Sequence, residues 1–191
     1  MGIYEKIKVD IAQPYYVDNF PNEGQRFVAW YLRNIYGLNT VQAKDCITDG
    51  PGDKQIDAVY VDDQAQTAYI IQGKFYSGPT VDAAPLREVL SSWMLIKDLP
   101  KLQESANDKL QSKITELATA IDEDYHICFE LLTTSSLTAS AQEDLVAYNR
   151  QLTEDEKLSA SIILVDADLL QSRLDEALDH ARPYINYEFP V

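Results

Sequence analysis

Residues 50–76 read GPGDKQIDAVYVDDQAQTAYIIQGKFY, and this stretch decides the fold that we expect for the chain. A loop rich in glycine and aspartate leads into two runs of β-branched and aromatic residues, 55–61 and 67–75. Because the short polar stretch 62–66 separates the two runs, the pattern predicts a β-hairpin.

The length of the connecting loop sets the register of this hairpin. A four-residue loop at 63–66 places Val61 opposite Ala68 and, further along, Asp57 opposite Gln72. Side chains directly opposed across a hairpin lie within about 5.5 Å of each other at their Cβ atoms. We therefore expect a carboxylate and an amide to meet at the open end of the hairpin.

Lys74 joins these two groups, because residues two apart on a strand project to the same face as Gln72 does. Oxygen atoms of a carboxylate and an amide suit a hard divalent cation. A nearby lysine can hold a water molecule or stabilise negative charge at phosphorus. The alternative is a surface salt bridge between Asp57 and Lys74, with Gln72 an exposed polar residue of the strand.

A helix is expected at 22–37, where Asn22 is a good N-cap before a helical apolar stripe. Glu23 falls on that stripe in the first turn. It either faces an internal site or is simply favoured there by the helix dipole. Residues 39–47 are expected to form a strand, and residues 1–21 an extended lead-in.

Downstream of the hairpin, helical and apolar stretches alternate. We expect helices at 82–99, 103–121, 140–149 and 166–180, and strands at 126–133 and 161–165. This order predicts an α/β fold over residues 22–191, a single domain with one central sheet and flanking helices. The final residues, INYEFPV, resemble the start of a further strand, as in a domain taken from a longer protein.

Composition excludes several classes of protein. The 191 residues are 46% hydrophobic and 25% charged, as in an ordinary globular domain. No apolar run of about 18 residues and no signal-peptide core are present, so we expect a cytoplasmic protein without a membrane partner. Two cysteines, Cys46 and Cys128, cannot build a disulfide framework or a multi-cysteine zinc site, and we interpret both as buried thiols.

The net charge of −15 limits the possible partners, and most of the acidic excess lies in residues 101–191. Non-specific binding of nucleic acid needs lysine and arginine at the phosphates. Any nucleic-acid role must therefore act locally, through metal ions or a partner.

The chain resembles the PD-(D/E)XK nuclease superfamily in three places: Glu23 on a helix, Gly52-Asp53 and Ile56-Asp57 ahead of a strand, and Gln72-Gly73-Lys74 on the next strand. It is most similar to Mrr-like endonucleases and to the N-terminal domain of AIPR-type abortive-infection phage-resistance proteins. The similarity spans about residues 22–134. It implies a restriction endonuclease-like fold, a central mixed β-sheet flanked by helices, with an αβββαβ core and C-terminal β/α additions.

The resemblance also implies roles for individual residues. Asp57 would be the metal-binding acid, and Gln72 and the Gly73 carbonyl would be further ligands of Mg²⁺ or Mn²⁺. Lys74 would be the catalytic lysine, and Glu23 the helix glutamate. Gln72 departs from the usual aspartate or glutamate of the motif, which removes one negative charge and weakens cation binding.

The implied activity is that of a metal-dependent endonuclease cleaving DNA, with RNA as the other candidate substrate, in restriction or anti-phage defence. Asp53, Lys54 and Tyr76 are expected beside the substrate, although Asp53 also suits a simple turn. A homodimer and a further C-terminal domain are candidate partners. The alternative is a weak or inactive nuclease-fold module that binds a protein or RNA.

Overall fold

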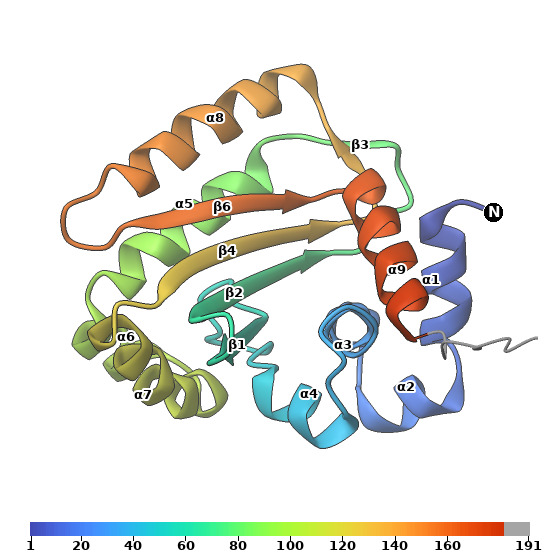
Figure 1. Cartoon of the computed structure of the whole chain (residues 1–191), viewed down its shortest axis with the longest axis horizontal. Coiled ribbons are helices and arrows are strands. Elements are labelled where there is room, and N and C mark those ends of the chain that lie inside the picture. Colours follow the sequence, from blue (N-terminus) through green and yellow to red (C-terminus); the bar gives the residue numbers. More distant parts are fainter. Residues whose placement is uncertain (182–191) are drawn as a thin grey trace, which may run out of the picture.

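The computed structural model of the chain describes residues 1–181, which surround one four-stranded sheet of order β1-β2-β4-β6 (Figure 1). Its strands are β1 (Ala58–Asp62), β2 (Thr67–Lys74), β4 (His126–Thr133) and β6 (Ala160–Val165). β1 runs antiparallel to β2, whereas β2, β4 and β6 are parallel, so the sheet is mixed. The α/β class with a mixed central sheet and flanking helices is therefore confirmed.

The hairpin has the predicted register. Val61 pairs with Ala68, and the loop that joins the strands has four residues. The paired register ends at Ala58 and Ile71. Asp57 stays attached to β2 beyond that pair, because its backbone N–H donates to the Ile71 carbonyl at 2.9 Å and its side chain accepts from the Gly73 N–H.

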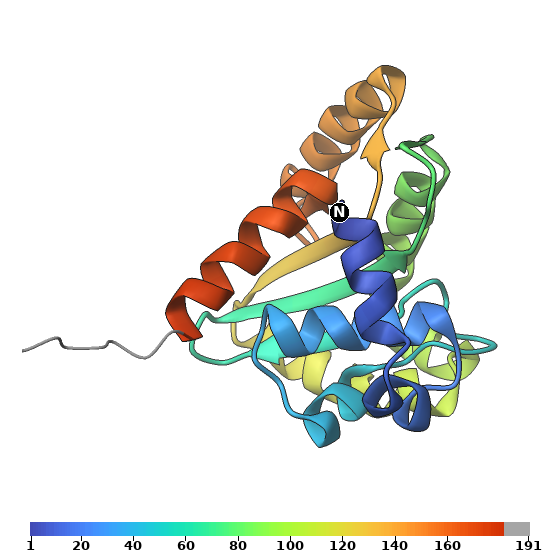
Figure 2. The same ribbon diagram turned by 90° about the vertical axis from the view of Figure 1, so that its right-hand side faces the viewer.

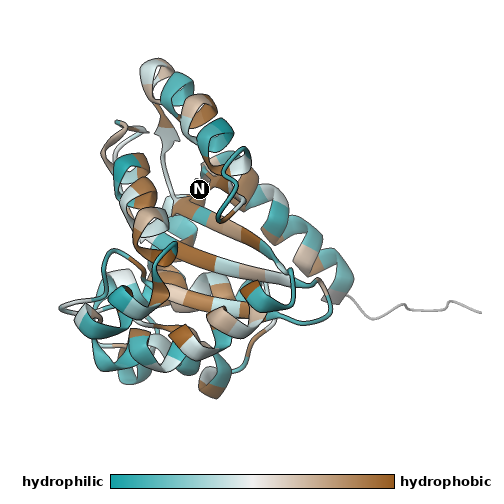
Figure 3. Ribbon diagram, turned by 90° about the vertical axis from the view of Figure 1, so that its left-hand side faces the viewer, coloured by the Kyte–Doolittle hydropathy of each residue, from teal (hydrophilic) through white to brown (hydrophobic). Residues whose placement is uncertain are grey.

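Helices cover both faces of the sheet, each over its own apolar cluster. One face carries α5 (Ala84–Ile96), α6 (Leu99–Ser105), α7 (Asp108–Asp122) and α8 (Ala139–Thr153). The other carries α1 (Ile3–Ile11), α2 (Pro14–Asn19), α3 (Glu23–Asn34), α4 (Thr40–Cys46) and α9 (Ala167–Ala181). Figure 2 shows α1 crossing α3, and Figure 3 shows that the strands between the layers are largely apolar.

A short second sheet lies beyond the carboxyl ends of the main strands. It consists of β3 (Thr80–Val81) and β5 (Ser136–Leu137), which pair in parallel. The Ser135 hydroxyl donates to the Gly78 carbonyl at 2.6 Å and strengthens the same contact. The chain that follows Lys74 is thereby held against the chain that follows β4.

The strand predicted at 39–47 is wrong, because this segment forms α4. Asn39 and Gln42 make a reciprocal capping box in which each side chain accepts from the backbone N–H of the other. Ala43 and Cys46, three residues apart, turn inward, which is helical spacing. The local caps outweigh the β-branched content, so only two strands of the main sheet precede α5.

The extended lead-in predicted at 1–21 is also wrong, because α1 and α2 lie there. Ile3, Ile7 and Ile11 are buried at four-residue spacing and form the inner face of α1. Pro14 opens α2 in its first turn, where a proline needs no backbone donor. This part of the chain belongs to the layer that covers the sheet.

Helix boundaries differ in the segment after α5. Three helices stand where 82–99 and 103–121 were expected: α5 ends at Ile96, Pro100 lies in the first turn of α6, and the Asn107 side chain caps α7. Thr138 caps α8, so this helix begins one residue before the expected 140. Asp166 caps α9, at the expected start of that helix. The strand expected near the end of the chain lies outside the described residues.

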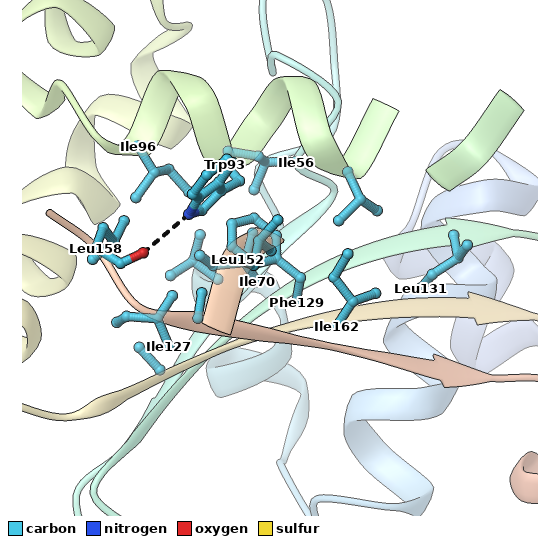
Figure 4. Packing of buried hydrophobic residues seen from close by; sticks show 14 of the residues in the cluster. Ile56, Ile70, Trp93, Ile96, Ile127, Phe129, Leu131, Leu152, Leu158 and Ile162 are labelled. Atoms are coloured by element: carbon cyan, nitrogen blue, oxygen red, sulfur yellow. Dashed lines mark hydrogen bonds between the residues drawn. The ribbon is translucent and has the colours of Figure 1, made fainter. Parts of the chain in front are cut away.

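Trp93 of α5 anchors the first apolar layer (Figure 4). Its ring is buried, and its indole N–H donates to the Leu158 carbonyl at 3.2 Å. Burial of an indole stabilises a core when its polar hydrogen has an acceptor. This contact fixes α5 over the strands and so fixes the side chains that α5 points toward the hairpin.

A buried ionic network holds the other layer. Glu130 of β4 has no exposed surface, and its Oε2 accepts from the Tyr31 and Tyr36 hydroxyls, each at 2.9 Å. Its Oε1 accepts from Arg173 of α9 at 2.6 Å. Burial, followed by the negative charge of Glu130, raises the pKa of both tyrosines above its ordinary value, so they remain donors.

We predict that Arg173→Met destabilises the fold by about 3–5 kcal/mol, because it leaves a buried carboxylate without its counter-ion. Urea denaturation measures the loss. The control is Arg150→Met, which breaks an exposed ion pair with Glu154 and should change stability by less than about 1 kcal/mol. Glu130→Gln added to Arg173→Met should restore part of the loss, and equal losses from Arg173→Met and Arg150→Met would contradict the explanation.

Candidate metal and hydrolytic site

The candidate site lies where the parallel strands β2, β4 and β6 end and the antiparallel strand β1 begins. Ligand sites in open α/β sheets usually lie at this edge. Gln72 and Lys74 both reach Glu88 on the sheet face that α5 covers, and the Asp57 carboxylate lies on the backbone N–H of Gly73 between them. The structure thus places the three predicted residues next to one another, and their role stays a prediction.

Asp57 is held by the backbone of the opposite strand. Its Oδ2 accepts from the Gly73 N–H at 2.7 Å. Burial, together with the smaller effect of the negative charges of Asp49 and Asp53, raises the pKa of Asp57 from its ordinary range to about 7. The Gly73 N–H and the Lys74 charge act in the opposite direction and lower that pKa.

Gly73 is required by the close approach of β2 to α3. A Cβ built on Gly73 would lie 2.7 Å from the Val28 side chain and 3.8 Å from Asp57 Oδ2. The first distance is far below normal van der Waals contact, so any larger residue must move the strand or the helix. The glycine lets α3 close over the strand and lets the Gly73 N–H reach Asp57.

Lys74 and Gln72 share one acceptor on α5. Glu88 Oε2 lies 2.7 Å from Lys74 Nζ and 2.5 Å from Gln72 Nε2. Burial alone would lower the pKa of Lys74, but the hydrogen bond and charge of Glu88 raise it above its ordinary value. The ion pair of Lys74 is thus with Glu88, and Gln72 is buried, which excludes the alternative of an exposed strand residue.

The loop ahead of β1 adds two more carboxylates. Asp49, Asp53 and Asp57 each place one carboxylate oxygen within 4.8 Å of the others. Asp53 shapes this loop, since its carboxylate accepts from the Gly50 and Gln55 N–H groups. It therefore both forms the turn and belongs to the cluster.

The same loop has an unusual backbone at two consecutive residues. Lys54 and Gln55 have φ values of 57° and 64°, in the left-handed region. Such a conformation costs a non-glycine residue roughly 1–2 kcal/mol. Hydrogen bonds offset the cost: the buried Ser92 hydroxyl donates to the Lys54 carbonyl at 3.0 Å, and Asp53 accepts from Gln55. Strain held in this way is frequent at functional sites.

These donors fit a hard divalent cation. The cluster offers only oxygen atoms, as Mg²⁺, Mn²⁺ and Ca²⁺ prefer. In addition, Gln72 Oε1 is buried and has no hydrogen-bond partner among the described residues. A buried amide oxygen without a donor calls for a positively charged or hydrogen-bearing group.

Glu23 does not join this group. It lies exposed in the first turn of α3 and makes no hydrogen bond or ion pair within residues 1–181. This placement agrees with the helix-dipole alternative. Two other residues at this end of α3 reach the loop. The N-cap Asn22 donates to Asp49 Oδ2 and the buried Gln25 donates to the Asp49 carbonyl, each at 3.4 Å.

Lys54 and Tyr76, predicted beside the substrate, lie on the two segments that border the site. Lys54 is half-buried in the acidic loop. Tyr76 is 40% exposed, and its backbone N–H and carbonyl both bond to the Thr134 hydroxyl. Their contact with a substrate stays a prediction.

Sequence reasoning missed Asp49 and Glu88. Asp49, Asp53 and Asp57 recur every four residues, a spacing that identifies a carboxylate cluster once the loop is known to fold on itself. Glu88 has no local signal, because only the packing of α5 against β2 brings it to Lys74.

The two cysteines are free and buried, as predicted. Burial raises the pKa of the Cys46 thiol to about 11 and that of Cys128 to about 12. Neither thiol is poised for nucleophilic chemistry.

Comparison with protein-family models, with curated proteins and with solved structures finds no match for this chain. Among the described residues, no helix combines the length and the apolar character needed to cross a membrane.

We predict that Gly73→Ala destabilises the fold by about 1–3 kcal/mol, because the added methyl group overlaps Val28. Urea denaturation measures the effect, and Val28→Ala in the same chain should recover part of it. Gly2→Ala is the control, since nothing lies within 4 Å of a Cβ at that position. A Gly73→Ala protein as stable as Gly2→Ala would refute the packing argument.

A second prediction concerns pH. Since folding raises the pKa of Asp57 to about 7, its protonated form is favoured by the fold. The resulting stabilisation is complete below about pH 4 and is lost as the pH rises through about 7. Relative to Asp57→Asn, the wild type should lose stability over this range by at most about 1.4 kcal/mol per pH unit.

Urea denaturation at several pH values tests this expectation. The control is Asp63→Asn, which changes an exposed residue of the hairpin loop and should follow the wild-type curve. If the curves of Asp57→Asn and wild type run parallel, Asp57 titrates as it does in the unfolded chain and the prediction fails.

Proposed function

We propose that this chain is a metal-dependent phosphodiester hydrolase that cleaves nucleic acid, DNA in the first place, as an endonuclease of restriction or anti-phage defence. The observation that carries the proposal is the meeting of Asp57, Gln72 and Lys74 at one sheet edge beside two further carboxylates. The resemblance of residues 50–76 to PD-(D/E)XK nucleases supplies the reaction class and the biological setting.

The residues that would hold Mg²⁺ or Mn²⁺ are Asp49, Asp53 and Asp57, with Gln72 Oε1 and, by resemblance, the Gly73 carbonyl. A bound cation would neutralise charge on a phosphoryl oxygen and acidify a water molecule. Burial, and after it the negative charges of Asp49 and Asp53, raises the pKa of Asp57, and a cation at this cluster would relieve the repulsion among the three carboxylates.

Lys74 acts in this proposal as a fixed positive charge. Its raised pKa keeps it protonated near neutral pH, so it donates hydrogen bonds rather than accepting a proton. An ammonium at this position orients a water molecule and stabilises negative charge that develops at phosphorus.

Local charge reconciles the proposal with an acidic chain. Lys54 belongs to the acidic loop, and Lys109 Nζ donates to the Asp49 carbonyl at 3.4 Å. Together with Lys74 they place three basic residues on the segments that form the site. A phosphate chain would meet these groups and the cation rather than the protein as a whole.

One observation favours the second candidate, a nuclease-fold module that binds a partner without cleaving. Glu88 already engages the Lys74 ammonium and the Gln72 amide nitrogen, so neither of these two groups is free for a substrate. In that case the chain binds a protein or RNA partner and leaves DNA intact.

We predict that Lys74→Ala lowers metal-dependent cleavage of supercoiled plasmid and single-stranded DNA by about 100-fold or more, because a stabilising charge is removed. Assays with Mg²⁺ and with Mn²⁺ measure it. Lys101→Ala, which changes an exposed lysine on α6, is the matched control and should cleave like wild type.

Equal cleavage by Lys74→Ala and wild type would rule out this site as the source of activity. Cleavage by none of the three proteins, with Mn²⁺ binding retained, would favour the binding module.

A further inference from the structure

We infer that Glu88 is a positioning residue of this site, which fixes the Gln72 amide so that its oxygen, and not its nitrogen, is offered to a divalent cation. The inference rests on the proposed function, and it deepens that function by naming what replaces the carboxylate that the motif normally has at position 72.

The first step is the polarity of the Glu88–Gln72 contact. Glu88 Oε2 lies 2.5 Å from Gln72 Nε2. An ionised carboxylate has no hydrogen to donate, so only the amide NH₂ can face it. The Gln72 oxygen is thereby turned away from Glu88.

The second step is the state of that oxygen. Gln72 is 4% exposed, and its Oε1 has no partner within the described part of the chain. Buried polar atoms without a partner are rare, and each one points to a ligand or ion that satisfies it. Because Asp57 accepts from the N–H of Gly73, the residue next to Gln72, this amide belongs to the same end of the hairpin as the carboxylate cluster.

The third step is the rigidity of the element that carries Glu88. One turn further along α5, the buried Ser92 hydroxyl donates to both the Glu88 carbonyl and the Lys54 carbonyl, each at 3.0 Å. Trp93 anchors the helix to Leu158. α5 therefore fixes the acidic loop through Ser92 and strand β2 through Glu88 at the same time.

The fourth step concerns Lys74, which shares Glu88 Oε2 with Gln72 at 2.7 Å. The Lys74 ammonium and the Gln72 NH₂ therefore meet at the same carboxylate oxygen, a charge-assisted arrangement that holds Glu88 in place beside the amide. Glu88 thus acts on a cation through Gln72, in the way that residues behind a metal ligand fix its orientation.

A double-mutant cycle tests the inference, with Mn²⁺ binding to the full chain measured by calorimetry. Glu88→Gln keeps the shape of the side chain but can present either end of its own amide, so the Gln72 amide loses its fixed orientation. We expect Mn²⁺ affinity to fall about 10-fold or more. Glu154→Gln, in an exposed ion pair on α8 and its C-cap, is the control and should leave affinity unchanged.

The second arm of the cycle places Glu88→Gln on a Gln72→Glu background. A carboxylate at position 72 offers an oxygen at either end and needs no orientation, and it is repelled by Glu88. There, Glu88→Gln should leave Mn²⁺ affinity unchanged or raise it. A general loss of charge or of folding would lower affinity in both backgrounds.

The result that overturns the inference is an equal fall in both backgrounds, unchanged affinity in the first, or no Mn²⁺ binding by wild type. A spectroscopic reading adds to the cycle: the Gln72 side-chain NH₂ signal should be protected from solvent exchange in wild type and lose protection in Glu88→Gln. If the cycle behaves as expected but DNA is not cleaved, only the proposed hydrolysis fails. If DNA is cleaved but the cycle fails, only the role of Glu88 fails.

Discussion

The hydrogen bond from the Gly73 N–H to Asp57 Oδ2 is the contact on which the site depends. It closes the open end of the hairpin and brings the acidic loop onto the end of β2. It can form only because position 73 lacks a side chain, since Val28 of α3 occupies the space that a Cβ would need. One glycine therefore sets the distance between helix and sheet and the position of the carboxylate. Asp57 lies where α3, β2 and the acidic loop meet, so a change in its position would require α3 or the loop to move.

Several features that are unfavourable for folding lie close to this hydrogen bond. Three carboxylates crowd together, two successive residues adopt left-handed backbone, and a buried amide oxygen has no partner within residues 1–181. The surrounding structure holds each of them in place, through Ser92 for the loop and Glu88 for the amide. Features that cost folding free energy, yet are held in place by neighbouring hydrogen bonds, are typical of sites that serve binding or chemistry.

The sequence was most informative where structure is determined locally. Loop length and alternation were sufficient to place Val61 opposite Ala68 and so to set the hairpin register, and caps or apolar runs located α3, β4, β6 and α9. The prediction of a strand at 39–47 was wrong because the β-branched residues of this segment favour a strand, whereas its capping box favours a helix. The burial of Ala43 and Cys46, three residues apart, shows that the helix forms. Glu88 was out of reach for a different reason. Its approach to Lys74 depends on how α5 crosses the sheet, which no neighbouring residue encodes. Glu23 shows the converse, a residue that fits a motif by position while its side chain stays in solvent.

The buried Glu130 also determines which part of this chain can fold without an unpaired buried charge. Its counter-ion comes from Arg173, so the centre of the sheet is neutralised by the last described helix. A shortened chain that stops before α9 would bury the Glu130 carboxylate in the sheet without its counter-ion. The acidic second half of the sequence is thus no solvated appendage, because one of its few basic residues neutralises a charge in the interior of the sheet. Any dissection of this protein into parts has to keep β4 and α9 together.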